Sequence, residues 1–118
     1  MPLTVLIVDD HPSFRATARA LLEAEGFDVI GEAADGATGV AAARELQPEV
    51  VLLDVQLPDT DGFAVASKLT ANGDGPSVVL TSSRDVSDYG GLVADSGARG
   101  FVAKSELSGE AISALLGP

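Results

Sequence analysis

Short apolar runs alternate along this chain with segments in which apolar residues recur every three or four positions. The apolar runs predict five β-strands, at residues 3–8, 27–32, 50–53, 78–81 and 99–103. Three of these runs are continuously apolar, which is typical of strands that are buried on both faces, as in a parallel sheet.

The segments that separate and follow the strands predict five helices, at residues 12–25, 36–46, 61–72, 85–96 and 108–116. In the first of them Phe14 and Ala18 lie on one face, and Pro12 suits the first helical turn. The fourth contains Gly90 and Gly91, each of which costs about 1 kcal/mol relative to alanine inside a helix. We hypothesise that these two glycines leave the fourth helix loosely held and able to move.

Strands that alternate with helices form parallel sheets through right-handed crossovers, with helices on both faces. The pattern therefore predicts an α/β fold, in which residues 1–118 form one doubly wound domain around a five-stranded parallel sheet. Such sheets bind ligands beyond the carboxyl ends of their strands. Five polar residues lie at, or just after, the ends of four predicted strands: Asp9, Asp10, Asp54, Thr81 and Lys104. We expect them to share one rim of the sheet.

The composition and charge of the chain argue against a membrane protein and against a nucleic-acid-binding protein. No apolar run approaches the roughly 20 residues that span a bilayer, and no signal sequence follows Met1. We expect a soluble, cytoplasmic protein that does not bind membranes, and the absence of cysteine fits the cytosol. The formal charge of −11 repels phosphate backbones, which argues against direct nucleic-acid binding by this chain.

Asp9, Asp10 and Asp54 form a set of oxygen ligands without thiolate or imidazole partners. Such hard oxygen ligands favour Mg²⁺, which keeps some of its water and accepts phosphate oxygens. Phosphoryl transfer requires in-line positioning and neutralisation of the phosphoryl oxygens, which Mg²⁺ and one lysine can supply. Lys104 is the candidate lysine. Asp54 is the candidate nucleophile, because a carboxylate can accept a phosphoryl group as an aspartyl phosphate.

Four motifs together resemble the receiver domains of two-component response regulators. They are D-D-H-P after the first strand, D-V-Q-L-P-D-T-D-G-F at the end of the third, L-T-S-S-R after the fourth and G-F-V-A-K after the fifth. The motifs match that family in order and spacing, and the resemblance covers residues 3–116. It implies a flavodoxin-like, receiver-like fold with strand order 2-1-3-4-5, the order of a chemotaxis receiver.

The resemblance also implies roles for single residues at the rim. Asp54 would accept a phosphoryl group from the phosphohistidine of a sensor histidine kinase, and Lys104 would pair with the phosphoryl oxygens. Asp10 and Asp54 would bind Mg²⁺ together with the backbone carbonyl of Gln56, while Asp9 would act mostly through a bound water. The chain would thus catalyse its own phosphorylation and dephosphorylation without being a metabolic enzyme.

A conformational switch is implied as well. The hydroxyl of Thr81 would turn toward the new phosphate, and the ring of Phe101 would enter the space that it leaves. The side chains of Gln56 and Ser83 would tune the dephosphorylation rate. The change would reach the face made by the fourth helix, the fifth strand and the fifth helix, and so control a homodimer, a downstream effector protein or an effector domain.

Several of these residues have a simpler alternative. Asp9 and Asp10 alone would suit a helix cap, Thr81 would suit a strand end, and Phe101 would suit core packing. His11 lies beside two acidic residues, which suggests a metal ligand or a phosphocarrier. We expect instead a solvent-exposed residue at the start of the first helix.

Three rival functions were weighed against a phosphorylated receiver. A phosphatase with an aspartyl nucleophile usually has a D-x-D motif, which is missing directly after the first and third strands. A flavin or dinucleotide protein has a glycine-rich or hydroxyl-rich loop after the first strand, where Asp9 and Asp10 would instead repel its phosphates. A degenerate receiver that acts as a phosphorylation-independent scaffold should lack the acceptor or the lysine, and this chain has both.

Two expectations concern the end of the chain. Many receivers have proline after the lysine, whereas Ser105 follows Lys104 here. We expect a trans peptide at that position, because a cis bond without proline costs roughly 3 to 4 kcal/mol. The compact end at Pro118 favours a complete single-domain regulator over a receiver cut from a longer protein.

Overall fold

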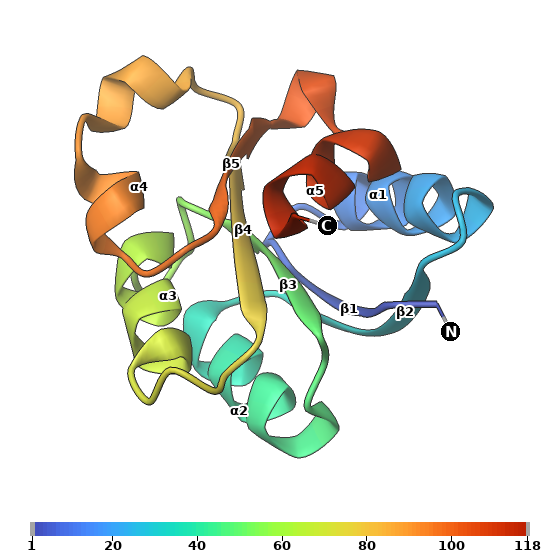
Figure 1. The fold of residues 1–118 in the computed structure, drawn as a ribbon, viewed down its shortest axis with the longest axis horizontal. Helices are drawn as coiled ribbons and strands as arrows, with labels where there is room; N and C mark the ends of the chain where they lie inside the picture. The colour runs from blue at the N-terminus through green and yellow to red at the C-terminus, as the bar shows by residue number, and fades with distance from the viewer. Residues whose placement is uncertain (1, 118) are drawn as a thin grey trace.

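The computed structural model describes residues 2–117, which form a five-stranded parallel sheet with helices on both faces (Figure 1). Met1 and Pro118, the outer bounds of the predicted domain, lie outside the described residues. The strand order is β2-β1-β3-β4-β5. The predicted fold class and strand order are therefore confirmed.

The strands agree with the predicted ranges to within one residue at each end. They are β1 (Thr4–Val8), β2 (Asp28–Ala33), β3 (Val50–Asp54), β4 (Ser77–Ser82) and β5 (Gly100–Ala103). The central strand β3 is buried at every position, which explains why its sequence is apolar up to the final aspartate.

Helices α1 and α5 cover one face of the sheet, and α2, α3 and α4 cover the other (Figure 1). Their bounds are α1 (Pro12–Ala24), α2 (Gly36–Leu46), α3 (Gly62–Thr70), α4 (Leu92–Asp95) and α5 (Gly109–Leu116). Two 3₁₀ turns, η1 (Val86–Tyr89) and η2 (Lys104–Glu106), follow β4 and β5. The side chains of Asp35, Asp61 and Ser108 cap α2, α3 and α5 by accepting a backbone N–H bond.

The single helix predicted over residues 85–96 is wrong. The turn η1 ends at Tyr89. The next residue, Gly90, has a φ of +56° and a ψ of −128°, which are incompatible with a helix, and α4 begins only at Leu92. Glycine reaches this conformation at no steric cost because it has no Cβ. The segment therefore forms two short helical pieces separated by a glycine turn.

Successive residues of the inner strands point to opposite faces of the sheet, so the core has two apolar layers. Leu6, Leu53 and Leu80 lie in the layer under α2, α3 and α4. Ile7, Leu52 and Val79 lie in the layer under α1 and α5. This packing fixes the carboxyl ends of β1, β3 and β4, where the candidate site lies.

Among residues 2–117, no helix combines the length and the apolar character that crossing a membrane requires.

Candidate functional site at the carboxyl ends of the strands

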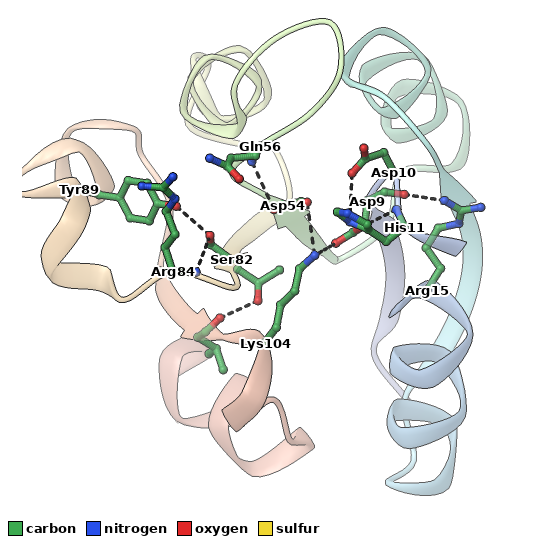
Figure 2. Close-up of polar contacts among 12 residues, drawn as sticks. Asp9, Asp10, His11, Arg15, Asp54, Gln56, Ser82, Arg84, Tyr89 and Lys104 are labelled. Atoms are coloured by element: carbon green, nitrogen blue, oxygen red, sulfur yellow. Dashed lines mark hydrogen bonds and ion pairs between the residues drawn. The ribbon is translucent and has the colours of Figure 1, made fainter. Parts of the chain in front are cut away.

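Three carboxylates and one lysine meet beyond the ends of β1, β3 and β5 (Figure 2). Asp9 and Asp10 follow β1, Asp54 is the last residue of β3, and Lys104 directly follows β5. Ligand atoms of Asp9, Asp10 and Asp54 all lie within 4.8 Å of one another. The structure thus brings together side chains from three segments that are far apart in the sequence.

Lys104 joins two of these carboxylates. Its Nζ lies 2.7 Å from Oδ2 of Asp9 and 3.4 Å from Oδ2 of Asp54. The side chains of both aspartates are at most 3% exposed, so the pairs are screened little by solvent. The Nζ also lies 4.5 Å from the ring centroid of Phe14 on α1, a cation–π contact that holds the ammonium at the rim.

The electrostatics of Asp54 follow from this crowding. Burial raises the pKa of the Asp54 carboxyl above its ordinary value of 3.8, and the neighbouring Asp9 raises it further. Two groups lower this pKa. One is the ammonium of Lys104, and the other is the backbone N–H of Gln56, which donates to Oδ1 of Asp54 at 3.2 Å. Asp54 is therefore held in a site where a second cation would relieve an unfavourable negative charge.

The side chains at this rim fit a hard divalent cation. Two buried oxygens, Oδ2 of Asp9 and Oδ1 of Asp10, accept no hydrogen bond within the part of the chain that the structure describes. The first of them has an ion pair with Lys104, and the second lies 3.2 Å from Nδ1 of His11. Unsatisfied buried carboxylate oxygens are costly, and Mg²⁺ is the ion that one or two carboxylates and water most often hold.

Thr81 lies on β4, next to the strand that carries Asp54, but its hydroxyl does not point toward Asp54. Its Cα is the partner of Asp54 in the pairing of β3 with β4. Its buried hydroxyl donates to the carbonyl of Val102 on β5 at 2.6 Å. Phe101, the predicted partner of Thr81 in the switch, is half-buried on the same strand. In this structure the hydroxyl therefore engages β5 and not the Asp54 carboxylate.

The sequence analysis missed Tyr89. Its hydroxyl is 2.7 Å from Oγ of Ser82, the residue after Thr81. Its ring packs edge-on against Phe63 on α3, with centroids 5.4 Å apart, and lies 5.8 Å from Phe101. Tyr89 thus connects β4, α3 and β5 at the segment where the expected helix is broken. No local pattern signals this role, because every partner comes from a different element.

Two further contacts that position the site were also missed. Arg15 donates through Nη1 to the backbone carbonyl of Asp9 at 2.6 Å and pairs with Glu32 at 3.0 Å. Asp59, in the loop after Asp54, accepts from two N–H groups at the start of α2, at 2.8 and 3.0 Å. Both residues attach a loop of the site to a neighbouring element.

His11 is the N-cap residue of α1, and its side chain is 63% exposed. The expectation of an exposed residue at the helix start is confirmed. Its Nδ1 nevertheless faces the site, 3.0 Å from Oδ1 of Asp9 and 3.2 Å from Oδ1 of Asp10.

No cis peptide bond occurs in residues 2–117, so the trans bond expected between Lys104 and Ser105 is confirmed. The chemical roles given to the rim residues, including the Mg²⁺ ligands and the tuning side chains of Gln56 and Ser83, stay predictions. Both tuning side chains are exposed.

Comparisons with known proteins agree on one family. A sequence profile described as the response regulator receiver domain matches residues 5–116. The BvgA transcription regulator of virulence factors from Bordetella pertussis is 42% identical over 110 residues, which cover 93% of this chain and 53% of BvgA. The DNA-binding transcriptional activator EvgA of Escherichia coli K12 is 31% identical over 96% of this chain and 55% of EvgA. The chain therefore spans about half the length of these relatives.

Solved structures give the same result. The signal receiver domain of the response regulator NarL from Mycobacterium tuberculosis matches with a TM-score of 0.86 and 31% identity, over 99% of this chain and 98% of that one. A complex of CheX with CheY, BeF₃ and Mg²⁺ from Borrelia burgdorferi matches with a TM-score of 0.84 and 25% identity, over 98% of this chain and 87% of that one.

Proposed function

Because this chain belongs to the response regulator receiver domain family, we propose that it is a phosphorylation-dependent signalling switch with Asp54 as the acceptor. The observation that carries the proposal is the position of Asp54, a buried carboxylate 3.4 Å from Lys104 and next to Asp9 and Asp10. A phosphoryl acceptor needs a nucleophile, a cation for the phosphoryl oxygens and a place for Mg²⁺. These residues supply all three.

The proposed reaction is an in-line displacement at phosphorus. A carboxylate oxygen of Asp54 forms the new P–O bond while the P–N bond to the kinase histidine breaks, and the histidine keeps the electron pair. Lys104 neutralises charge on the transferred group and moves from Asp9 toward the phosphoryl oxygens. Bound Mg²⁺ would be held by Asp10 and Asp54 with the carbonyl of Gln56, and Asp9 through water, and would supply charge neutralisation. Hydrolysis of the aspartyl phosphate returns the resting state.

The switch follows from the added charge. A phosphoryl group brings about −1.5 to −2 charges and three acceptor oxygens near neutral pH. The hydroxyl of Thr81 would leave the carbonyl of Val102 and donate to one of these oxygens. Phe101 would then move toward the space beside β4. Shifting the population of the active form from 1% to 99% requires about 5.5 kcal/mol of differential stabilisation.

The partners in this proposal are a sensor histidine kinase and a target that reads the face of η1, α4, β5 and α5. Relatives named as DNA-binding or transcription regulators are about twice as long as this chain, so an effector domain, a separate effector protein and a homodimer are all candidates for that target. We propose that residues 1–118 act as one receiver domain in the cytoplasm, with no direct contact to nucleic acid or membrane.

A titration with beryllium fluoride and Mg²⁺ tests the proposal, because beryllium fluoride mimics the phosphoryl group on a carboxylate. Amide spectra should shift at Asp54, Thr81 and Phe101 only when both components are present. Asp54→Asn and Asp10→Ala should abolish the shifts, whereas Asp74→Asn, an exposed change at the opposite end of the sheet, should preserve them. An unaltered response in both site variants would refute the assignment. No response of the native chain would favour a phosphorylation-independent scaffold.

A further inference from the structure

Tyr89 attaches the turn η1 to the end of β4. Its hydroxyl lies 2.7 Å from Oγ of Ser82, the last residue of β4, and Figure 2 shows the two side chains pointing toward each other. Ser82 is 1% exposed, and its Oγ also accepts the backbone N–H of Arg84 at 3.1 Å. A buried hydroxyl is costly to leave without its partner. The position of η1 is therefore tied to the side chain that directly follows Thr81.

The hydroxyls of Thr81 and Ser82 bind two different elements, because successive residues of a strand point to opposite faces of the sheet. Thr81 donates to the carbonyl of Val102 on β5, whereas Ser82 bonds to Tyr89 of η1. The carboxyl end of β4 is thus held from two sides, next to Asp54 on β3. A movement of Thr81 toward a phosphoryl group on Asp54 would change the geometry of both hydrogen bonds.

The ring of Tyr89 connects the same strand end to Phe101. The ring centroids of Tyr89 and Phe101 are 5.8 Å apart and tilted by 51°, and those of Tyr89 and Phe63 are 5.4 Å apart and tilted by 66°. Aromatic pairs favour such inclined arrangements. Phe101 cannot move toward β4 without changing its contact with Tyr89, whose hydroxyl is fixed to β4. Tyr89 therefore contacts both strands of the proposed switch.

The turn around Tyr89 has little other support. None of the residues of η1 is fully buried, and Val86 at its start is 45% exposed. Gly90 follows directly, with a φ of +56° that ends the helical geometry. In so short a turn, the contacts of one side chain decide much of its position. The hydrogen bond to Ser82 and the two aromatic contacts make Tyr89 the residue best placed to do so.

We propose that Tyr89 is a positioning residue for the phosphorylation of Asp54, which acts through Ser82. It stabilises the resting arrangement of β4 and η1, and the bond between the two hydroxyls breaks when Thr81 turns toward the phosphoryl group. An interaction made only in the resting form favours that form. The apparent affinity for a ligand of the active form falls with the fraction of active chain, so Tyr89 lowers the response to phosphoryl groups. This inference rests on the proposed function, since it concerns the switch at Thr81.

A titration of Tyr89→Phe with beryllium fluoride at saturating Mg²⁺ tests the inference. The variant keeps the ring beside Phe63 and Phe101 but lacks the hydroxyl. Its apparent affinity for beryllium fluoride should rise roughly two- to tenfold, the factor that corresponds to one typical hydrogen bond. Without beryllium fluoride, the amide signals of Thr81 and Phe101 should move part of the way toward their positions in the loaded native chain. A residue that only stabilises the fold would change neither quantity.

Thr4→Val is the matched control, because it also removes a single hydroxyl from the fold. Oγ1 of Thr4 accepts the backbone N–H of Glu49 at 2.9 Å, at the end of the sheet opposite the acceptor site. This variant should lower the stability and leave the affinity for beryllium fluoride unchanged. Ser82→Ala should raise the affinity as Tyr89→Phe does. Because both remove the same hydrogen bond, combining them should give no further increase.

An affinity that Tyr89→Phe leaves unchanged or lowers, or increases that add up in the double variant, would overturn the inference. A native chain that does not respond to beryllium fluoride and Mg²⁺ would instead refute the proposed function. The two failures are thus distinguished by the native chain alone.

Discussion

The ammonium of Lys104 lies closer to Asp9 than to the proposed acceptor, with Nζ to Oδ2 distances of 2.7 Å and 3.4 Å. Asp9 therefore holds the cation in the resting site, and Asp54 is only partly neutralised by it. In this arrangement the carboxylate of Asp54 is buried, and its negative charge is not fully compensated by a nearby cation. The first prediction follows from that deficit.

Replacing Asp54 with Asn should stabilise the fold at neutral pH when chelator keeps divalent ions away. The pKa of Asp54 is raised in the folded chain, first by burial and then by Asp9. An acid with a raised folded pKa contributes stability below its unfolded pKa and loses that contribution as the pH rises through its folded pKa. At neutral pH the charge on Asp54 thus opposes folding, and a neutral amide removes the penalty.

Urea unfolding of the native chain and of Asp54→Asn at several pH values measures this effect. The advantage of the variant should be largest at neutral pH and should shrink as the pH falls toward the ordinary value of 3.8. The exposed change Asp74→Asn serves as the control and should show no such trend. A variant that is no more stable than the native chain at pH 7 would contradict the assigned electrostatics.

Gly62 is expected to tolerate no side chain. A Cβ at this position would lie 2.4 Å from the carbonyl oxygen of Asp54 and 2.9 Å from Cα of Val55, and both are backbone atoms that cannot rotate away. Gly62→Ala should therefore lower the free energy of unfolding by about 1 to 3 kcal/mol, the usual cost of overpacking. It should also displace Asp54 and weaken the response to beryllium fluoride.

Gly91→Ala is the matched control for Gly62→Ala. Its backbone has an ordinary φ of −82°, and a Cβ there would meet only Oδ2 of Asp95, at 3.8 Å. Stability should be unchanged or raised by about 0.4 to 1 kcal/mol, because alanine restricts the unfolded chain. Urea unfolding of both variants would test the difference, and equal losses would show that close approach at Gly62 is not the cause.

Tyr89→Phe isolates the hydrogen bond between Tyr89 and Ser82 from the aromatic contacts. The variant keeps the ring beside Phe63 and Phe101 but removes the 2.7 Å contact to Oγ of Ser82. We expect a loss of about 0.5 to 1.5 kcal/mol, the typical net contribution of one hydrogen bond. A double-mutant cycle with Ser82→Ala should give a coupling energy of at least about 0.5 kcal/mol. Strictly additive effects would show that the two hydroxyls do not interact.

The parts of this structure that the sequence predicted are those set by local pattern. Strand β3 was predicted because a run buried on both faces is apolar throughout, and Asp54 was placed at the rim because it ends that run. The acidic pair after β1 and Lys104 after β5 followed from the same rule. Parallel strands must align their carboxyl ends, so strand ends alone bring these groups together.

The parts that the sequence did not predict depend on contacts between distant elements. Tyr89 bonds to β4 and packs on α3 and β5, and Asp59 reaches the start of α2. Neither contact leaves a periodic signal. The prediction of one helix over residues 85–96 was wrong for another reason. The sequence shows that Gly90 is costly inside a helix, but the choice between a strained helix and a turn depends on how the segment packs.

The broken segment supports the last prediction, that residues 86–95 open more readily than α1. Leu92 and Val86 are 51% and 45% exposed, no residue of η1 or α4 is fully buried, and the helical pieces have only four residues each. Segments with few buried contacts and short helices are among the least stable parts of a folded protein.

Amide hydrogen exchange should therefore be faster in residues 86–95 than in α1, whose Ala18 and Leu22 are fully buried. Beryllium fluoride with Mg²⁺ should change the rate in residues 86–95 while leaving α1 unaffected. Protection equal to that of α1, with and without the phosphoryl mimic, would show that Gly90 and Gly91 do not make this segment movable.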